Sequence, residues 1–144
     1  VNKEGRGTPY VTGPEQWDGS RLHMDKWTTE PKRMAPAGSV FVTVKGAGVG
    51  TVFPGVAAAI GRDVYAFEPK AGVSPSFVEH ALRFTVQDVI RHAVGDIPGL
   101  SKSHITDHWI GLPPPEEQKL IVAALESHFS RLDAASATLE RVQR

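Results

Sequence analysis

The sequence contains no cysteine, which excludes disulfide bonds and any metal site that needs thiolate ligands. It also has no apolar run long enough to span a bilayer, because its most apolar stretch, residues 49–60, is interrupted by Gly50, Pro54 and Gly55. No signal peptide opens the chain. We therefore expect a cytoplasmic protein.

The chain also lacks an excess of charge of either sign. Its 16 Lys and Arg residues are balanced by 16 Asp and Glu residues, so the formal net charge is zero. A protein that holds nucleic acid by bulk electrostatics is expected to carry a strongly basic face. Any DNA binding must therefore come from local groups of cations, and we expect it to be weak for the chain alone.

Catalytic motifs are absent as well. The sequence contains no nucleophile elbow, no Walker loop and no evident pair of catalytic carboxylates. With 40% hydrophobic and 22% charged residues over 144 positions, the composition is that of a folded domain with one ordinary core. We expect a protein without catalytic residues, metal or cofactor. Because the last residues still have a helical pattern with no stop signal, we also expect a piece of a longer chain.

Three segments predict short strands of a small twisted sheet. Residues 40–44, 51–53 and 64–67 are rich in β-branched and aromatic side chains and are bounded by Gly or Pro. Residues 1–39 are instead rich in Gly, Pro, Thr and charge, and they predict mostly irregular chain.

Helical spacing of apolar residues begins at Ser74, which is a favourable N-cap with proline at the next position. Thr85 predicts the start of a second short helix that ends at Gly95, and Ser103 predicts one further helical turn. Strands and helices together predict an α+β domain with flanking short helices.

Gly46, Gly48 and Gly50 invite comparison with a phosphate-binding loop. Such a loop needs a strand before it and a helix N-terminus after it. The strand is present, but residues 51–54 are extended in pattern, so a glycine hairpin or bulge is favoured. Lys45 beside this turn remains a candidate for contact with a DNA phosphate.

His104, Asp107 and His108 have the spacing of metal ligands. A zinc hydrolase also needs a further ligand and a placed base, and nothing nearby supplies them. We expect ordinary hydrogen-bonded or exposed histidines here and no metal.

The clearest single pattern is a long helix over residues 116–144, after three prolines at 113–115. We expect the prolines to project this helix away from the preceding domain. Its apolar positions alternate in steps of four and three, as in a coiled coil, and such a seam needs a partner helix. The predicted helix-pairing residues are Ile121, Leu125, His128, Leu132, Ala135, Leu139 and Val142.

Residues 111–129 read Gly-Leu-Pro-Pro-Pro-Glu-Glu-Gln-Lys-Leu-Ile-Val-Ala-Ala-Leu-Glu-Ser-His-Phe. This stretch resembles the junction in specificity subunits of type I restriction-modification enzymes where a target-recognition domain gives way to a helical spacer. Looser likeness extends upstream, through the opening loop at residues 7–10 and the strand and glycine turn at residues 37–50. Residues 59–63 depart from the family pattern, in which an Asn-Gln pair often precedes the third strand.

The resemblance implies a recognition domain over residues 1–112 and a helical spacer over residues 113–144, truncated at its C-terminus. It implies sequence-specific recognition of one half of a bipartite site in double-stranded DNA. The chemistry would belong to methyltransferase and restriction subunits bound to the spacer. A half-subunit could also pair with a copy of itself through the long helix.

DNA contacts call for cations, hydroxyls and amides on loops. Arg21, Lys32 and Arg33 are secondary candidates, and the predicted DNA-binding residues are Lys3, Arg6, Thr8, Tyr10, Lys45, Ser101, Lys102 and His104.

Two other functions fit parts of the pattern. A small nucleotide- or metal-dependent enzyme would use residues 46–50 or His104 and His108. A coiled-coil assembly module would use the long helix and would not bind DNA. The loop at residues 7–10 together with the junction at residues 111–118 favours the recognition domain over both.

Overall fold

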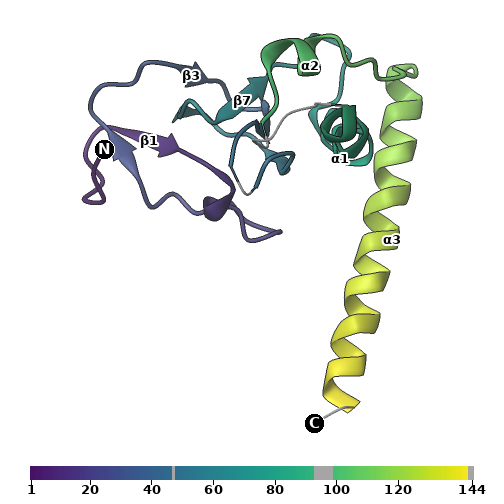
Figure 1. Ribbon diagram of the computed structural model, residues 1–144. Coiled ribbons are helices and arrows are strands. Elements are labelled where there is room, and N and C mark those ends of the chain that lie inside the picture. The colour runs from purple at the N-terminus through teal and green to yellow at the C-terminus, as the bar shows by residue number, and fades with distance from the viewer. Residues whose placement is uncertain (47, 93–98, 143–144) are drawn as a thin grey trace.

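The computed structural model describes residues 1–46, 48–92 and 99–142, with His92 and Val142 described by their backbone only. Two small sheets and three α-helices form a mixed α+β fold with one long C-terminal helix, which confirms the predicted fold class (Figure 1). None of the helices described is both long and apolar enough to cross a membrane.

The first sheet has the strand order β2–β1–β6–β3, formed by Trp27–Thr28, Thr8–Val11, Ala58–Ile60 and Met34–Ala35. Strands β1 and β6 are parallel, and the other pairs are antiparallel. The prediction of irregular chain is therefore wrong for these segments before residue 39. Strands of two to four residues are too short to show an alternating pattern.

Strand β1 contains Pro9, although proline cannot donate to a sheet ladder. The two halves of β1 pair with different strands. Thr8 and Pro9 pair with β2, whereas Tyr10 and Val11 pair with β6. Proline is tolerated where a strand is paired on only one side.

The second sheet contains the three predicted strands in the antiparallel order β5–β4–β7, formed by Val52–Pro54, Val40–Thr43 and Val64–Phe67. All four residues of β4 are buried. Phe41 packs with Val11 and Phe53 in a cluster on the face towards the first sheet. Val40 and Val42 lie on the opposite face, in the cluster that includes residues of α1. The second sheet is thus the central layer of the domain.

Helix α1 spans Pro75–His92 without interruption, so the prediction of two short helices is wrong. Thr85 lies inside the helix, where its hydroxyl donates to the carbonyl of Ala81 at 2.9 Å instead of capping a new N-terminus. Leu82 and Val86 continue one apolar face against the central sheet. A Thr that bonds back by one turn is compatible with a helix interior.

Helix α2 spans Lys102–Thr106, and it is capped by Ser101 rather than by Ser103. The Ser101 hydroxyl accepts from the backbone of His104, whose ring in turn accepts from the Ser101 N–H. This reciprocal arrangement is a capping box in which a histidine takes the place usually held by Glu or Gln.

Helix α3 spans Pro115–Val142 and begins at the last of the three prolines. The expectation that the prolines project the whole helix away from the domain is wrong for its first turns. Ile121, Val122 and Leu125 are half-buried, and α3 packs beside α1. From residue 130 to residue 141 every side chain is exposed, and Figure 1 shows this part extending beyond the rest of the protein.

Candidate nucleic-acid interface

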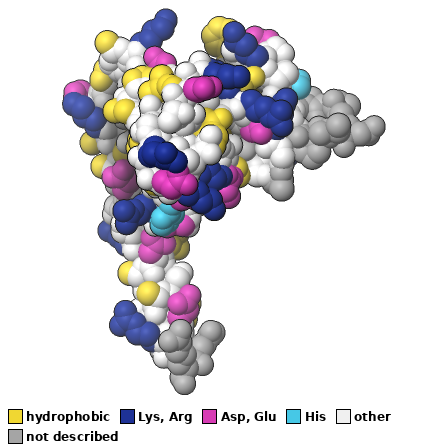
Figure 2. Space-filling model, turned by 90° about the vertical axis from the view of Figure 1, so that its left-hand side faces the viewer, with side chains coloured by type: hydrophobic (Ala, Val, Ile, Leu, Met, Phe, Trp, Pro, Cys, Tyr) yellow, Lys and Arg dark blue, Asp and Glu magenta, His cyan; other side chains and the backbone are white. Residues whose placement is uncertain are grey.

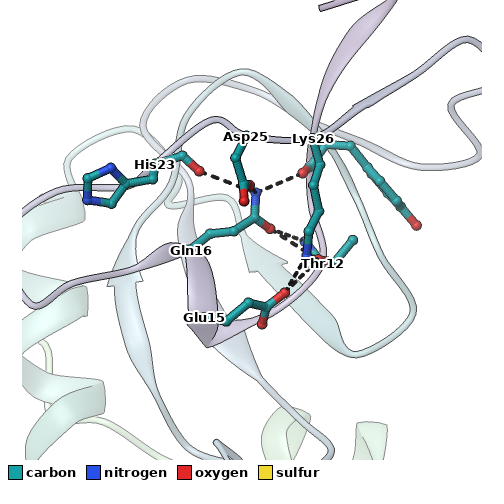
Figure 3. A network of polar contacts seen from close by, with 7 residues as sticks. Thr12, Glu15, Gln16, His23, Asp25 and Lys26 are labelled. Carbon is teal, nitrogen blue, oxygen red and sulfur yellow. Dashed lines mark hydrogen bonds and ion pairs between the residues drawn. The ribbon is translucent and has the colours of Figure 1, made fainter. Parts of the chain in front are cut away.

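A buried glutamine stabilises the first sheet, which we call the N-terminal sheet from here on (Figure 3). Gln16 is 1% exposed, and its amide oxygen accepts from the backbone N–H of Thr12 at 2.7 Å. Its amide nitrogen lies 3.1 Å from the carbonyl of Tyr10 and 2.9 Å from the carboxylate of Asp25. One side chain therefore ties the end of β1 to the segment at residues 23–25 that leads into β2.

A salt bridge extends this network towards solvent. The Lys26 ammonium donates to the Thr12 hydroxyl at 2.7 Å and to the Glu15 carboxylate at 2.6 Å. Burial raises the pKa of Glu15, but hydrogen bonds from Lys26, the backbone and Thr12 outweigh it, and the net pKa is lowered. The Glu15 carboxylate is thus ionised at neutral pH, and it holds the Lys26 ammonium in this network.

Beside this sheet lies an open hollow of about 910 Å³. Strand β1 contributes Tyr10, and the turn that follows β6 contributes Arg62. Other residues that line it are Val1, Thr12, Thr28, Thr29, Glu30, Lys32, Arg33, Ile60, Gly61 and Asp63. Tyr10, Thr28 and Ile60 belong to strands of the first sheet, and most of the other lining residues carry hydroxyl or charged side chains.

A second hollow of about 660 Å³ adjoins the first, because Arg33 and Ile60 line both. Its walls come from β7 and α2, which contribute Tyr65 and Lys102. We call the two hollows together the trough. Among the described residues, the trough is lined by four cationic side chains (Lys32, Arg33, Arg62 and Lys102) and three carboxylates (Glu30, Asp63 and Glu68).

Arg33 is held at the junction of the two hollows. Its guanidinium donates to the carbonyl of Gly61, and its own carbonyl accepts from Ile60 at 3.1 Å. Arg62 is the residue after Gly61, and its side chain is 91% exposed and lies 3.6 Å from the Asp63 carboxylate. One arginine is therefore fixed in direction, and the other is free to reorient.

Positive charge is spread over this side of the protein rather than gathered in one place. Figure 2 shows Lys and Arg side chains interspersed with Asp and Glu over the face that includes the N-terminal sheet. This distribution agrees with the zero net charge of the chain. An anionic ligand here would depend on a few well-placed cations and on hydrogen bonds.

The predicted DNA-binding residues fall into separate groups in the structure. Tyr10 lines the first hollow, and Lys102 lines the second. Lys45 is near the α2 end of the trough, because it pairs with Gly99 in an isolated bridge and the Leu100 N–H donates to Val44 at 2.7 Å.

The other predicted residues are engaged differently. Lys3 and Arg6 are exposed on the N-terminal loop, where the Arg6 guanidinium lies 2.6 Å from the Glu4 carboxylate. Thr8 is half-buried opposite Thr28 in the sheet. Ser101 and His104 use their side chains in the cap of α2. None of these five residues lines the trough.

Arg62 is the trough residue that sequence reasoning missed, and Lys32 and Arg33 were given only a secondary place. Arg62 lies in the segment that departs from the family pattern, which forms β6 and the turn after it. A Gly-Arg-Asp turn between two short strands carries no local signal that separates it from an ordinary surface loop. Its position became informative only once β1 and β3 were known to flank β6.

The glycine-rich segment is a hairpin turn, as predicted. Strands β4 and β5 on either side of it are antiparallel, and Gly46 and Gly50 have positive φ angles of 81° and 83°. No helix follows it, so it lacks the N-terminus that would hold a phosphate. Ala47 lies outside the described residues.

The histidines of the metal-like motif have other partners. His104 belongs to the α2 cap, and the His108 ring lies 2.8 Å from the Thr85 hydroxyl. Across the part of the chain that the structure describes, no three His, Asp or Glu side chains are grouped to hold a metal ion.

The predicted pairing seam of α3 divides into two parts. Ile121 and Leu125 are half-buried against α1. His128, Leu132, Ala135 and Leu139 are exposed, with Leu132 at 61% and Leu139 at 64%. The side chain of Val142 lies outside the described residues.

The chain forms a small α+β domain with one long attached helix, and comparisons with known proteins identify its family. Residues 2–144 match the family described as the type I restriction modification DNA specificity domain. The chain therefore belongs to this family. A search of curated proteins found no match.

Two solved structures share the fold. One, from work titled "Structural basis underlying complex assembly and conformational transition of the type I R-M system", is 26% identical with a TM-score of 0.82, over 93% of this chain and 34% of that chain. The other is the HsdS subunit from Thermoanaerobacter tengcongensis, 26% identical with a TM-score of 0.78, over 92% of this chain and 32% of that chain. The chain thus spans about a third of the length of these two structures.

Proposed function

We propose that this chain is one target-recognition domain of a type I specificity subunit and reads one half of a bipartite site in double-stranded DNA. Residues 1–112 are the recognition domain, and residues 113–144 are the helical spacer. The domain itself performs no catalysis. Methylation and cleavage belong to methyltransferase and restriction subunits, and the complex acts on DNA in the cytoplasm.

The observation that carries this proposal is the trough in a chain of this family. Arginine suits both parts of DNA recognition, because its planar fork can bind a phosphate or the guanine edge in the major groove. Arg33 is held in one direction by Gly61, as a residue that reads bases must be. The exposed Arg62 and Lys102 suit phosphate contacts, which position the domain without reading sequence.

The near balance of charge in the trough supports a dependence on partners. Four cations against three carboxylates attract a polyanion only weakly. Strong binding would then need further contacts from methyltransferase subunits around the same duplex. This agrees with a domain that supplies selectivity while other subunits supply much of the affinity.

The exposed half of α3 supports a helical partner. Leu132 and Leu139 lie on one stripe, and apolar side chains of this size gain stability when a second helix covers them. In the subunit this partner is the spacer of the other recognition domain, and a second copy of this chain could take its place. Sedimentation of the chain tests the second case: Leu132→Asp with Leu139→Asp should convert a dimer to a monomer, and a monomeric wild type would refute self-pairing.

The decisive experiment selects bound sequences from a randomised duplex pool, using the chain together with methyltransferase subunits at two salt concentrations. A short enriched motif is the expected result. The triple variant Arg33→Gln, Arg62→Gln and Lys102→Gln should lose at least tenfold in affinity. Each phosphate contact removed should also make the negative slope of log affinity against log salt less steep by about 0.9.

A matched control removes the same charge elsewhere. Arg21→Gln, Lys70→Gln and Arg91→Gln change three exposed cations that lie outside α3 and do not line the trough. This control should keep the motif and most of the affinity. Equal losses in both triple variants would reduce the effect to bulk charge, and the absence of any enriched motif in the wild type would refute sequence recognition.

A further inference from the structure

Gln118 is the one buried side chain among residues 115–141 of α3, with 1% exposure. Its amide oxygen accepts from the backbone N–H of Ser74 at 2.8 Å. Its amide nitrogen donates to the carbonyls of Gly72 at 3.2 Å and Pro113 at 2.8 Å. A single side chain thus joins the entry of α1 to the entry of α3 through three backbone groups.

The bonds of Gln118 use the amide group completely in one orientation. The oxygen faces a donor, and both N–H groups face acceptors, so rotating the amide by half a turn would replace all three attractive contacts with repulsive ones. The Ser74 hydroxyl also accepts from the Phe77 N–H at 3.3 Å, which places the contact at the N-cap of α1. The three hydrogen bonds of Gln118 therefore hold the start of α3 in one orientation relative to the start of α1.

The rest of the contact between α1 and α3 specifies the angle less strictly. A ring contact lies further along the helices, where the rings of His80 and Phe129 stack with their centroids 5.9 Å apart. Ile121 and Leu125 are half-buried against α1 near it. Between the two contacts is an open apolar hollow of about 430 Å³, lined by residues that include Phe77, Phe84 and Leu125. Packing fixes an angle when side chains interdigitate closely, and here they leave a gap.

Small changes of angle at Gln118 become large at the far end of α3. The helix runs for about 36 Å from residue 118 to residue 142 at ~1.5 Å per residue. A tilt of about 15°, within the usual scatter of helix packing angles, moves that end by ~9 Å. This is the length of nearly three base pairs at ~3.4 Å each.

We propose that Gln118 is a positioning residue that fixes the angle of α3 on the recognition domain, and thereby the separation at which a specificity subunit reads its two half-sites. The first half of this inference concerns the free chain. The second half rests on the proposed function. If Gln118 had only a structural role, it would stabilise the domain without restricting the range of angles between α3 and the recognition domain. The two roles therefore predict different results.

The angle can be measured directly because the chain has no cysteine of its own. Spin labels at Ala57→Cys, on the recognition domain, and at Ala137→Cys, on the exposed part of α3, report their separation by double electron–electron resonance. Both sites are exposed and carry small side chains. Dilution with unlabelled protein in the full chain removes distances between copies.

Gln118→Met keeps the size of the side chain and removes all three hydrogen bonds. It should broaden the distance distribution, or shift its maximum, by several ångströms. Gln16→Met is the matched control, because it removes an equally buried glutamine network that does not touch α3. It should lower stability and leave the distance unchanged.

Gln118→Asn is a second variant in case Gln118→Met fails to fold. It keeps the amide group but is one methylene shorter, so it cannot reach all three backbone groups and should give an intermediate broadening. Unchanged distributions in the variants of Gln118, or equal broadening in Gln16→Met, would overturn the inference.

The consequence for DNA is tested separately with the complete complex. Duplexes that carry both half-sites at varied separations should show one preferred spacing for the wild type. Gln118→Met should accept neighbouring spacings with the same bases in each half-site, and a retained single spacing would overturn this part. Failure of the wild type to bind any half-site would refute the proposed function and leave the distance measurement to decide the role of Gln118.

Discussion

Replacing Gln16 with leucine should destabilise the whole N-terminal sheet, although the two side chains are similar in size. The Thr12 N–H would lose its acceptor, which costs about 1–3 kcal/mol for a part-buried donor. The bonds to Tyr10, His23 and Asp25 would also be lost, each worth about 0.5–1.5 kcal/mol when intact. Because leucine gains some apolar burial in return, we expect a net loss of about 3 kcal/mol.

This loss is a large part of the free energy of unfolding of an ordinary domain, which is about 5–15 kcal/mol. It corresponds to a fall in Tm of about 6–12 °C for a chain of this size. Urea titration and thermal unfolding measure both quantities. Gln87→Leu, at an exposed position of α1, is the control and should change stability by no more than about 0.5 kcal/mol.

The same variant should weaken DNA binding, because the Gln16 amide holds the carbonyl of Tyr10 and Tyr10 lines the trough. Amide exchange at Thr12 should quicken before global unfolding. A loss in stability below about 1 kcal/mol would refute the reasoning, since it would mean that water replaces the glutamine at little cost.

Two further predictions concern a glycine and a carboxylate. Gly7→Ala should lower the free energy of unfolding, measured by urea titration, by more than about 2 kcal/mol, because φ is +93° and an added Cβ would lie 2.3 Å from the Thr28 carbonyl oxygen. Gly46→Ala has a similar φ but open space around the added Cβ, so it should lower the free energy of unfolding by only about 1 kcal/mol. Equal losses in the two variants would exclude the steric cause. Burial raises the pKa of Glu79 above 4.5, with Glu126 adding to the rise and with Arg83 and His80 opposing it, so folded protein binds this proton more tightly than unfolded protein. The contribution of Glu79 to stability should therefore fall as pH rises through its raised pKa, and this slope should vanish in Glu79→Gln; identical pH profiles for the two proteins would contradict the assignment.

The sequence carried strong local signals for some elements. The β-branched run at β4 and the long apolar period of α3 are each sufficient to specify an element, because the same pattern continues along the whole segment. The junction at residues 111–118 was also readable, and the family it indicated is confirmed by the match over residues 2–144. Strands β1, β2, β3 and β6 were missed because each is held by its neighbours rather than by its own pattern.

The interruption predicted in α1 was wrong for a related reason. Thr85 and Asp88 have the residue types of a capping box, but the apolar face on both sides of them packs on one sheet. Continuous burial outweighs a local capping preference of about 1 kcal/mol. The interior of the helix was thus decided by the surface that it covers.

Composition, local period and one junction motif determined the α+β class, the long helix and the family. Only the tertiary structure decided which side chains share a surface. It brought Tyr10, Arg33 and Lys102 to one trough, and it made Gln118 a joint with Gly72 and Ser74, more than 40 positions earlier. Local patterns reflect the preferences of neighbouring residues, whereas these contacts depend on how short strands and helices pack after distant parts of the chain have met.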